Sequence, residues 1–401
     1  MLAERGGAND WGRSSIFLDK MSCQFLRILS ILGAQAIGAP LMKAAVCRVF
    51  GEKLSIEDLQ LSAPAAGEVR VNLKACAICH SDLFFVDGSW GGDLPQIYGH
   101  EAAGVVEAVG PGVERVKPGD HVVVTLIRHC GDCHYCHLDQ EVLCETSFPL
   151  DERSPLSDHS GVSVGHGLRT GGFAEQVLVE ASQVCPVPET IPFDAACLLA
   201  CGVITGFGAV MNTAAVPRGA SVAVIGCGGV GLNALQGALH VGANPIIALD
   251  VVPEKLVAAN HFGATDVINS GDGDPLARIQ ELTGGRGVDY VFVTVGAKAA
   301  IDQSIAMLSR GGTAVIVGMP ASGVLGEYDP GNLAAAGQRI IGSKMGSARV
   351  SVDIPFLARL YLEGALKLDE LISGRYPLEQ INEAIEDVRR GTALRNVIVF
   401  P

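Results

Sequence analysis

Hydrophobic and polar positions follow two different patterns along the chain. Between Met42 and about residue 180, apolar and polar residues alternate with a period of two over short segments bounded by turn residues. Residues 69–75 and part of 103–110 alternate in this way, and strands are also expected at 43–50 and, after a turn, at 122–124. Successive side chains of a strand point to opposite faces, so this pattern predicts a small, irregular, mostly antiparallel barrel.

From about residue 219, short apolar runs alternate with stretches of helical periodicity. Strands are expected at residues 221–225, 246–250, 290–295 and 313–317. This alternation is typical of βαβ units and a parallel sheet. Beyond residue 343 the pattern predicts an amphipathic helix, a proline-bounded segment at 376–378, a helix over 384–390 and a last strand over 395–400. This tail is too small to fold alone, so we expect it to rejoin the first domain.

The expected fold class is α/β, with a β-rich domain joined to a doubly wound parallel sheet. Four segments are expected. They are a disordered N-terminal extension over 1–41, the first part of the β-rich domain over 42–202, the parallel-sheet domain over 203–343, and a return segment over 344–401 that completes the β-rich domain.

The first forty residues have two interpretations. From Met21 they faintly resemble a secretory signal, with one basic residue, a short apolar stretch and small residues after it. Export would expose metal-binding thiolates to oxidation, and Met42 opens a well-patterned strand. We therefore expect a translational extension upstream of a start at Met42, with a targeting segment as the alternative. N-terminal sequencing of the native protein distinguishes the two.

Composition limits the classes of partner. Of the 401 residues, 48% are hydrophobic and 18% are charged, which is too apolar for disorder and long enough for two packed domains. The formal net charge is −14, and we find no cluster of Lys and Arg. Nucleic acids and anionic membranes both require such a cluster, so neither is an expected partner. No apolar run reaches the roughly 18 to 20 residues of a membrane span.

Twelve cysteines invite a disulfide interpretation, but that pattern belongs to short secreted chains. Four of them, Cys130, Cys133, Cys136 and Cys144, stand close together in a loop containing glycine. Four thiolates at this spacing can close tetrahedrally around one zinc ion and brace a segment with little core of its own. A closed site leaves no position for substrate, so we expect it to be structural. Disulfides or free thiols are the alternative, and metal binding favours a reducing, cytoplasmic location.

A glycine-rich turn follows the expected strand at 221–225. Residues 226–231 match G-x-G-x-x-G and open an expected helix, and this context is typical of a dinucleotide-binding turn. The residues concerned are Gly226, Gly228, Gly229, Val230 and Gly231. They let the backbone approach a pyrophosphate at the helix N-terminus.

Asp250 ends the next expected strand, 250 − 231 = 19 residues beyond the last glycine of this turn. A carboxylate there accepts hydrogen bonds from a ribose 2′-OH and repels a 2′-phosphate, which favours NAD over NADP. An ordinary strand-end residue is the alternative. Lys255 follows within a turn, as a second ribose contact or as a surface lysine.

A second group of metal-ligand residues is spread along the chain. Cys79 opens the run Cys-His-Ser-Asp, His100 is followed by Glu101, and Cys201 stands far downstream near the domain junction. Two thiolates and an imidazole form an open zinc site that keeps its fourth position for substrate. Asp82 could orient His100 through its distal ring nitrogen, and Glu101 adds a carboxylate beside the metal.

Taken together, these motifs resemble the zinc-dependent alcohol dehydrogenases of the medium-chain dehydrogenase/reductase superfamily, from about Met42 to Phe400. The motifs are C-H-S-D at 79–82, G-H-E-A-A-G-V-V-E-A-V-G at 99–110, the four-cysteine loop, C-G-V-I-T-G at 201–206 and G-C-G-G-V-G at 226–231. The resemblance implies a GroES-like catalytic domain, a Rossmann cofactor domain, NAD, and two zinc ions per chain. It also favours a homodimer or homotetramer.

Roles for individual residues are likewise implied by this resemblance. Cys79, His100 and Cys201 would hold the catalytic zinc, with Asp82 and Glu101 behind them, and the four-cysteine loop would hold the structural zinc. Ser81 would be the first proton-relay hydroxyl. His80 and Arg395 would lie near the pyrophosphate, Thr205 along the nicotinamide, and the backbone at Val295 and from Val317 to Met319 against the carboxamide.

The implied reaction transfers hydride between a primary or secondary alcohol and NAD, giving an aldehyde or ketone. Two departures from relatives matter. Phe84 replaces the histidine that carries the relay proton outward in liver-type relatives, so water or His80 would have to substitute. Phe148 stands where the glutathione-dependent formaldehyde branch has an arginine, although Arg153 is nearby.

Alternatives to this reaction come from three classes. Polyol, aryl-alcohol or thiol-adduct formaldehyde dehydrogenases share the same fold. A zinc-independent quinone or enone reductase conflicts with the intact ligand set. A non-catalytic zinc- or nucleotide-binding redox sensor conflicts with the presence of all three ligands and the relay hydroxyl.

Overall fold

The structure is a computed structural model that describes residues 41–401, and Met42–Pro401 forms one compact unit. The expected extension and its possible targeting role lie outside the described residues. Among residues 41–401, no single helix is long and apolar enough to cross a membrane. One pair, Phe193–Ala200 with Gly202–Thr213, reaches the required length and composition only together, and it is bent by 51°.

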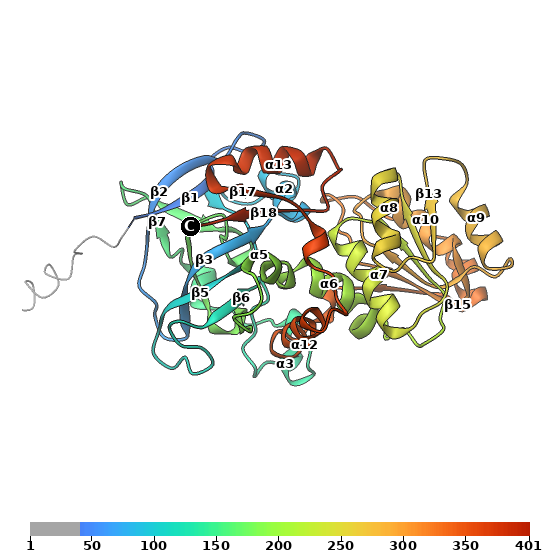
Figure 1. The fold of residues 1–401 in the computed structure, drawn as a ribbon, viewed down its shortest axis with the longest axis horizontal. Coiled ribbons are helices and arrows are strands. Elements are labelled where there is room, and N and C mark those ends of the chain that lie inside the picture. Colours follow the sequence, from blue (N-terminus) through green and yellow to red (C-terminus); the bar gives the residue numbers. More distant parts are fainter. Residues whose placement is uncertain (1–40) are drawn as a thin grey trace, which may run out of the picture. The chain divides into compact units, whose positions relative to one another are not determined.

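Two sheets make up the β-rich domain, and both are drawn on the left of Figure 1. The strands are β1 (Leu41–Cys47), β2 (Ser55–Leu61), β3 (Glu68–Ala77), β4 (Gln96–Ile97), β5 (Glu101–Val109), β6 (His121–Val124), β7 (Leu156–Ser157), β8 (Ser163–His166), β9 (Gln176–Glu180), β10 (Val184–Pro186), β17 (Ile372–Pro377) and β18 (Arg395–Val399). One sheet closes as a barrel in the order β1-β2-β7-β8-β4. The other runs β10-β6-β5-β3-β18-β17, with β9 paired to β3. Buried Leu59, Val71, Leu73, Ile97 and Phe173 belong to the core between them.

The end of the chain returns to this domain. β18 pairs antiparallel with β3, which lies more than 300 residues earlier, and parallel with β17. In Figure 1 these two red strands lie beside the blue β3, with helix α13 (Ile381–Arg389) above them. The return brings Arg395, the first residue of β18, into the centre of the molecule.

A six-stranded parallel sheet forms the second domain. Its order is β13-β12-β11-β14-β15-β16, so the chain winds outward in both directions from β11. The strands are β11 (Val222–Ile225), β12 (Ile246–Asp250), β13 (Asp266–Asn269), β14 (Val288–Val293), β15 (Leu308–Ile316) and β16 (Arg339–Gly342). This is the expected doubly wound arrangement, and the α/β fold class is confirmed.

Helices cover both faces of this sheet because both faces are apolar. Val222 and Val224 of β11 pack in the core that includes helix α7 (Gly229–Val241), while Ala223 and Ile225 pack with Ile279 of helix α9 (Pro275–Leu282). The remaining helices of this domain are α8 (Pro253–His261), α10 (Lys298–Ala306) and α11 (Pro330–Ala336).

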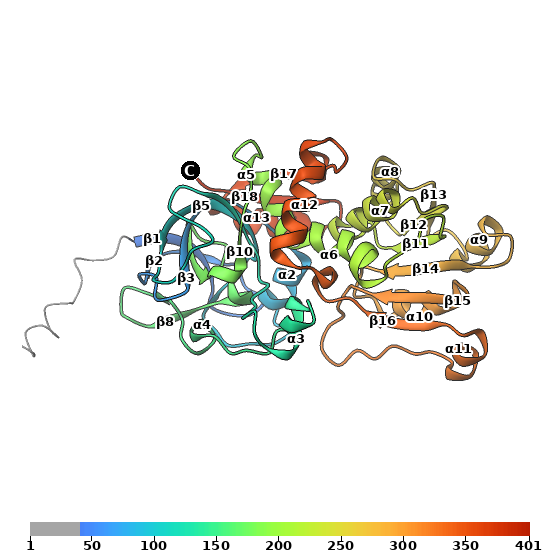
Figure 2. The same cartoon turned by 90° about the horizontal axis from the view of Figure 1, so that it is seen from below.

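Helices α6 (Gly202–Gly208) and α12 (Val350–Leu362) lie between the two domains (Figures 1 and 2). A Cβ added at Gly206 would be 2.1 Å from the carbonyl oxygen of Val230. The backbones of α6 and α7 therefore meet directly, and this close approach requires glycine. Cys201, a predicted metal ligand, caps the N-terminus of α6. The contact between α6 and α7 therefore places Cys201 beside the glycine-rich turn that precedes α7.

Candidate active site and metal centres

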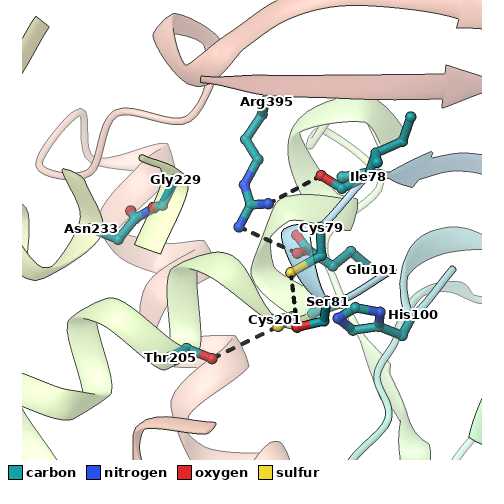
Figure 3. Close-up of polar contacts among 12 residues, drawn as sticks. Ile78, Cys79, Ser81, His100, Glu101, Cys201, Thr205, Gly229, Asn233 and Arg395 are labelled. Atoms are coloured by element: carbon teal, nitrogen blue, oxygen red, sulfur yellow. Dashed lines mark hydrogen bonds and ion pairs between the residues drawn. The ribbon is translucent and has the colours of Figure 1, made fainter. Parts of the chain in front are cut away.

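Three separate segments bring one cluster of ligand atoms together. Cys79 precedes helix α2 (His80–Val86), His100 precedes β5, and Cys201 precedes α6. Their ligand atoms and a carboxylate oxygen of Glu101 all lie within 4.8 Å of one another. All four residues are buried, and Figure 3 shows Cys79, His100 and Cys201 converging on one point. The spacing fits a single metal ion.

Asp82 fixes the imidazole of His100. Oδ1 of Asp82 lies 3.0 Å from Nδ1 of His100 and accepts the amide of Gly99 at 3.0 Å, while Oδ2 accepts the amide of Cys79 at 2.9 Å. The buried Nε2 of His100 has no protein partner and is free to face the two sulfur atoms. A buried, oriented nitrogen without a hydrogen bond is costly unless a ligand takes it, so the cluster fits zinc.

The charges of this cluster are strongly coupled. Interaction with Cys201 lowers the pKa of the Cys79 thiol, and the same interaction raises the pKa of Cys201. Burial lowers the pKa of His100, but the carboxylate of Asp82 outweighs it and the net shift is upward. Zinc binding requires thiolates and a neutral imidazole, so metal loading at this site releases protons.

Arg395 connects this cluster to the glycine-rich turn. Its Nη2 lies 3.3 Å from Oε1 of Glu101, and its Nη1 donates to the carbonyl of Ile78 at 3.2 Å (Figure 3). A Cβ added at Gly202 would be 2.0 Å from Nη2, and one at Gly229 would be 2.1 Å from Nε. The guanidinium is therefore seated between two glycines, one from each domain.

Glu101 is held behind the ligands by this ion pair. Burial raises the pKa of its carboxyl group to about 8, and Arg395 opposes the rise. The pKa of Arg395 is itself raised by Glu101 and the thiols, although burial lowers it. The pair is thus a buried charge network in contact with the ligand shell.

Two hydroxyl groups flank the sulfur atoms. Oγ of Ser81 lies 3.7 Å from Sγ of Cys79, and Oγ1 of Thr205 lies 3.8 Å from Sγ of Cys201. Sequence reasoning did not single out Met345, whose Sδ lies 3.9 Å from Sγ of Cys201 and 3.7 Å from Oγ1 of Thr205. Met345 begins a turn in which three consecutive residues have positive φ angles, and its sequence carries no recognisable motif.

One cavity of about 1410 Å³ contains both the metal cluster and the glycine-rich turn. Ligand pockets usually measure about 300–1000 Å³, so this one has room for a dinucleotide and a second molecule. The predicted residues that line it are Cys79, His80, Ser81, His100, Cys201, Thr205, Gly228, Gly229, Val230, Gly231, Asp250, Lys255, Val295, Val317, Met319 and Arg395. Asp82, Glu101 and Gly226 lie behind this lining. The cavity therefore brings the two halves of the predicted site together.

The glycine-rich turn has the geometry of a phosphate cradle. Gly226 has a φ of +96°, and a Cβ added at Gly231 would be 1.7 Å from the Gly226 carbonyl oxygen. A Cβ at Gly228, the residue that caps α7, would meet nothing within 4 Å, so this backbone is open to the cavity. Open amides at the N-terminus of a 13-residue helix favour an anion such as pyrophosphate.

Asp250 is held at the far end of this cradle. Its Oδ2 accepts the amide of Cys227 at 2.6 Å, and Oδ1 accepts the amides of Val251 and Val252 at 2.8 and 3.0 Å. The hydrogen bonds from three amides fix the direction of this side chain. Lys255 also lines the cavity.

The four-cysteine loop forms a second metal-binding cluster. The sulfur atoms of Cys130, Cys133, Cys136 and Cys144 lie within 4.8 Å of one another, with Sγ–Sγ distances of 4.0 Å for Cys130–Cys136 and 3.8 Å for Cys133–Cys144. A hydrogen bond with Thr146 and the amide of Asp132 lower the pKa of Cys130 to about 6. The described cysteines are all free thiols, so the disulfide alternative does not hold for residues 41–401.

Glu141 ties this loop to the rest of the molecule. Its Oε2 accepts the amide of Val350 at 2.9 Å, at the N-terminus of α12, and lies 3.5 Å from Nδ1 of His129. No local sequence pattern indicates this contact, because the two partners are 209 residues apart.

Comparisons with known proteins agree with this geometry. Residues 65–189 match the family model of the alcohol dehydrogenase GroES-like domain, and residues 229–359 match that of the zinc-binding dehydrogenases. An NDMA-dependent alcohol dehydrogenase of Amycolatopsis methanolica is 38% identical over 89% of this chain and 98% of its own length. A probable S-(hydroxymethyl)glutathione dehydrogenase of Schizosaccharomyces pombe is 36% identical over 89% and 96%.

Solved structures give the same result. An alcohol dehydrogenase zinc-binding domain protein from Burkholderia ambifaria has a TM-score of 0.86 and 38% identity, covering 90% of this chain and 99% of its own. Benzyl alcohol dehydrogenase from Acinetobacter calcoaceticus has a TM-score of 0.84 and 33% identity over the same shares. The chain therefore belongs to the zinc-dependent alcohol dehydrogenases of the medium-chain dehydrogenase/reductase superfamily and is an oxidoreductase that uses zinc and a nucleotide cofactor.

Proposed function

We propose that this enzyme transfers hydride between a primary or secondary alcohol and NAD, giving an aldehyde or ketone. The observation that carries the proposal is the single cavity in which the Cys79–His100–Cys201 cluster faces the glycine-rich turn. An alcohol at the cluster would have its carbon next to a nicotinamide bound through that turn. The three-ligand set also favours an enzyme over a zinc-independent reductase or a redox sensor.

The choice of NAD over NADP rests on Asp250. Its carboxylate lines the cavity beyond the phosphate cradle and is fixed by three backbone amides. A fixed negative charge there favours the two hydroxyl groups of an adenosine ribose and repels a 2′-phosphate. Lys255 on the following helix is a candidate for a second ribose contact.

Two zinc ions per chain are proposed. Cys79, His100 and Cys201 would hold the catalytic ion, and Cys130, Cys133, Cys136 and Cys144 the structural one. When bound at the first site, zinc supplies a Lewis acid that lowers the pKa of a bound hydroxyl, much as it lowers that of water from about 15.7 to about 7. A nicotinamide held at the glycine-rich turn would supply the hydride acceptor.

The protein itself would orient the reactants and move the proton. Ser81 lines the cavity next to Cys79, so its hydroxyl can accept the proton of the alcohol. The side chain of Phe84 cannot pass a proton onward, which leaves solvent or His80 as the next acceptor. Thr205 lies on the opposite side of the cluster and can contact the nicotinamide ring. The backbone at Val295 and from Val317 to Met319 is proposed to bind its carboxamide.

The substrate alternatives follow from the relatives. S-(hydroxymethyl)glutathione and benzyl alcohol are named as substrates of similar proteins, and one relative is named NDMA-dependent. A screen of primary, secondary, aryl and polyol alcohols, and of formaldehyde with and without a thiol, would identify the branch. It should be run with NAD and with NADP, each in the presence and absence of NDMA. Absence of NADH formation with every alcohol would overturn the proposal.

Assembly and location complete the proposal. We expect a homodimer or homotetramer built through the parallel-sheet domain, in the cytoplasm. β16 pairs only with β15 among the described strands, and Ile340 on it is 38% exposed. Leu325 and Tyr328, in the segment between β15 and α11, are 78% and 55% exposed. An exposed strand edge with apolar neighbours favours pairing with a second copy. Light scattering at micromolar concentration tests this.

A further inference from the structure

Lysine and arginine side chains line the cavity that contains the metal cluster and the glycine-rich turn. Three of these cations have carboxylate partners, in the pairs Arg349–Asp139, Arg389–Asp87 and Arg395–Glu101. The remaining two, Lys255 and Lys344, form no ion pair with a carboxylate within residues 41–401. Lys255 is proposed for the ribose of the cofactor. Lys344 is therefore the cation of this cavity to which the proposed function gives no role.

Lys344 lies close to the metal cluster. The next residue, Met345, has its Sδ 3.9 Å from Sγ of Cys201, so the lysine is one residue away from a contact with a predicted ligand. The short turn η6 (Met345–Ser347), which follows Lys344, contacts the short turn η1 (Glu141–Leu143). Lys344 thus borders the cavity where the metal cluster and the end of the four-cysteine loop approach each other.

The charges around Lys344 favour the binding of an anion. Partial burial lowers the pKa of its ammonium group, the guanidinium of Arg169 lowers it further, and the thiol of Cys144 opposes the shift. Arg169 is itself paired with Asp151, with Nε 3.4 Å from Oδ1. Lys344 therefore has a second cation near it and no carboxylate of its own. An anion entering the cavity would compensate this repulsion between like charges.

Hydroxyl groups stand on both sides of Lys344 in the sequence. Oγ of Ser343 and Oγ of Ser347 each lie 2.8 Å from Oγ1 of Thr213, and all three residues line the cavity. Three hydroxyl groups have three protons, and the two hydrogen bonds among them use two. One O–H therefore remains to donate to a ligand, and an anion is the acceptor that would bind it most strongly.

Aliphatic side chains complete this part of the cavity. Leu143 precedes Cys144 and Leu168 precedes Arg169, so each leucine comes from a segment that also carries a group close to Lys344. A hydrocarbon chain packed against these leucines removes its apolar surface from water, whereas a charged end group needs a partner of opposite charge. The cavity therefore fits a molecule with a hydroxyl group at one end, a hydrocarbon spacer and an anionic group at the other end.

We propose that Lys344 binds a carboxylate at the distal end of the substrate, so that the enzyme prefers primary alcohols with an anionic group to neutral alcohols of the same length. This inference rests on the proposed function. The alcohol carbon passes a hydride to NAD and the hydroxyl loses one proton, while the carboxylate is unchanged. An ω-hydroxy acid would give an aldehyde, and the hydroxymethyl adduct of an acidic thiol would give a thioester. Lys344 is a specificity residue, since it contacts the distal anion and not the reacting atoms.

Matched substrates separate charge from length. ω-Hydroxyhexanoate and its methyl ester have the same carbon chain, but only the first is an anion. Lys344→Met keeps the length of the side chain without its charge, and it should lower the ratio of the kcat/KM values, acid over ester, about five- to tenfold, mainly through KM. Lys344→Arg should retain most of the ratio. Lys117→Met is the control, because Lys117 is exposed and does not line the cavity.

Ionic strength gives a readout that a structural role of Lys344 would not produce. In the parent enzyme the preference for the acid should decrease as sodium chloride is added, because salt screens the attraction between the ammonium group and the carboxylate. In Lys344→Met the ratio should respond little. Formaldehyde with mercaptopropionate, compared with formaldehyde and its methyl ester, repeats the measurement for thiol adducts. The arm that shows a preference dependent on Lys344 identifies the source of the carboxylate.

The outcomes distinguish the two proposals. If the parent enzyme forms NADH from no alcohol, the proposed function fails. If the parent is active but shows no preference for the acid in either arm, or if Lys344→Met keeps that preference, the anion site is overturned. A loss of zinc or a lower Tm in Lys344→Met with an unchanged ratio would make Lys344 a counter-ion of the four-cysteine cluster instead. A preference lost in Lys344→Met and kept in Lys344→Arg supports the inference.

Discussion

The carboxylate of Asp250 is hydrogen-bonded to the glycine-rich turn, with Oδ2 2.6 Å from the backbone nitrogen of Cys227. Two further amides, of Val251 and Val252, bind Oδ1. Asp250 therefore shapes the glycine-rich turn and, under the proposed function, would also present a negative charge to the ribose of the cofactor. Any substitution that tests the second function also has to respect the first.

Asp250→Asn separates these functions. The amide oxygen can still accept the Cys227 amide, while the side-chain nitrogen no longer accepts the amides of Val251 and Val252, and the negative charge is lost. We expect the ratio of kcat/KM for NADP to that for NAD to rise about tenfold or more, because repulsion of the 2′-phosphate disappears. Asp250→Ala should in addition weaken the binding of both cofactors, since the turn loses its acceptor. An unchanged cofactor ratio in Asp250→Asn would contradict the assigned role.

Cys79→Ala should remove the catalytic zinc and the activity together. Loss of a Lewis acid removes several kcal/mol of transition-state stabilisation, so turnover should fall by at least about a thousandfold. Zinc content should fall from two to one per chain. Cys185→Ala is the control, because burial raises the pKa of that thiol to about 12 and no ligand lies near it among the described residues. Full turnover in Cys79→Ala would exclude this site as the reaction centre.

The fold was predictable to the extent that local pattern determines it. The expected strand at 246–250 matches β12, and those at 69–75 and 221–225 differ from β3 and β11 by one or two residues at the ends. The expected strand at 313–317 covers only the second half of β15. Its first half contains Arg310, Gly311 and Gly312, which interrupt the apolar pattern, and the pairing with β14 shifts register there, with a φ of +75° at Gly311. β13 and β16 lie at the sheet edges, where exposed polar residues weaken the signal.

For the site, the sequence predicted which residues would bind the metal together, but not which residues would surround them. Spacing and residue type select Cys79, His100 and Cys201, and the structure brings their ligand atoms together. The contacts of Arg395 with Gly202 and Gly229 depend on the return of β18 to β3, which no local motif encodes. The hydrogen bond between Trp90 and Pro320 could not be predicted from the sequence either, because it joins two domains through an indole N–H and a backbone carbonyl.

Cys133→Ser should destabilise the protein by opening the four-cysteine cluster. Three thiolates hold zinc less tightly than four, so we expect zinc content to fall from two to one per chain and Tm to decrease by several degrees. Metal analysis and thermal unfolding of the same sample measure both effects. Cys47→Ser is a matched control, since Cys47 is buried outside either cluster and its loss should leave two zinc ions. A parent enzyme with a single zinc would contradict the two-site interpretation.

Glu141 should make the stability of α12 depend on zinc binding in the four-cysteine loop. Glu141→Ala removes the acceptor of the Val350 amide and should cost about 1 kcal/mol, as for other lost helix N-terminal acceptors, whereas Glu141→Gln keeps an acceptor and should cost less. If the loop needs zinc to hold Glu141 in place, the effect of Glu141→Ala should shrink in the Cys133→Ser background. Strictly additive unfolding free energies would show that the two features are independent.

Asp289 gives a pH-dependent prediction for the parallel-sheet domain. Its Oδ2 accepts the amide and hydroxyl of Ser221 at 2.9 and 2.7 Å, and Oδ1 accepts the hydroxyl of Ser309 at 3.2 Å. Burial raises the pKa of Asp289, but these hydrogen bonds outweigh it and the net shift is downward. Because the pKa is lower in the folded state, the ionised carboxylate stabilises the protein above the unfolded-state pKa of about 3.9. This stabilisation is lost as the pH falls through the folded-state pKa. Asp289→Asn should therefore lower the free energy of unfolding by about 1–2 kcal/mol above about pH 5, and the gap to the parent should narrow at lower pH. Urea denaturation from pH 7 to below pH 3 measures the gap, and a gap that widens on acidification would contradict this sign.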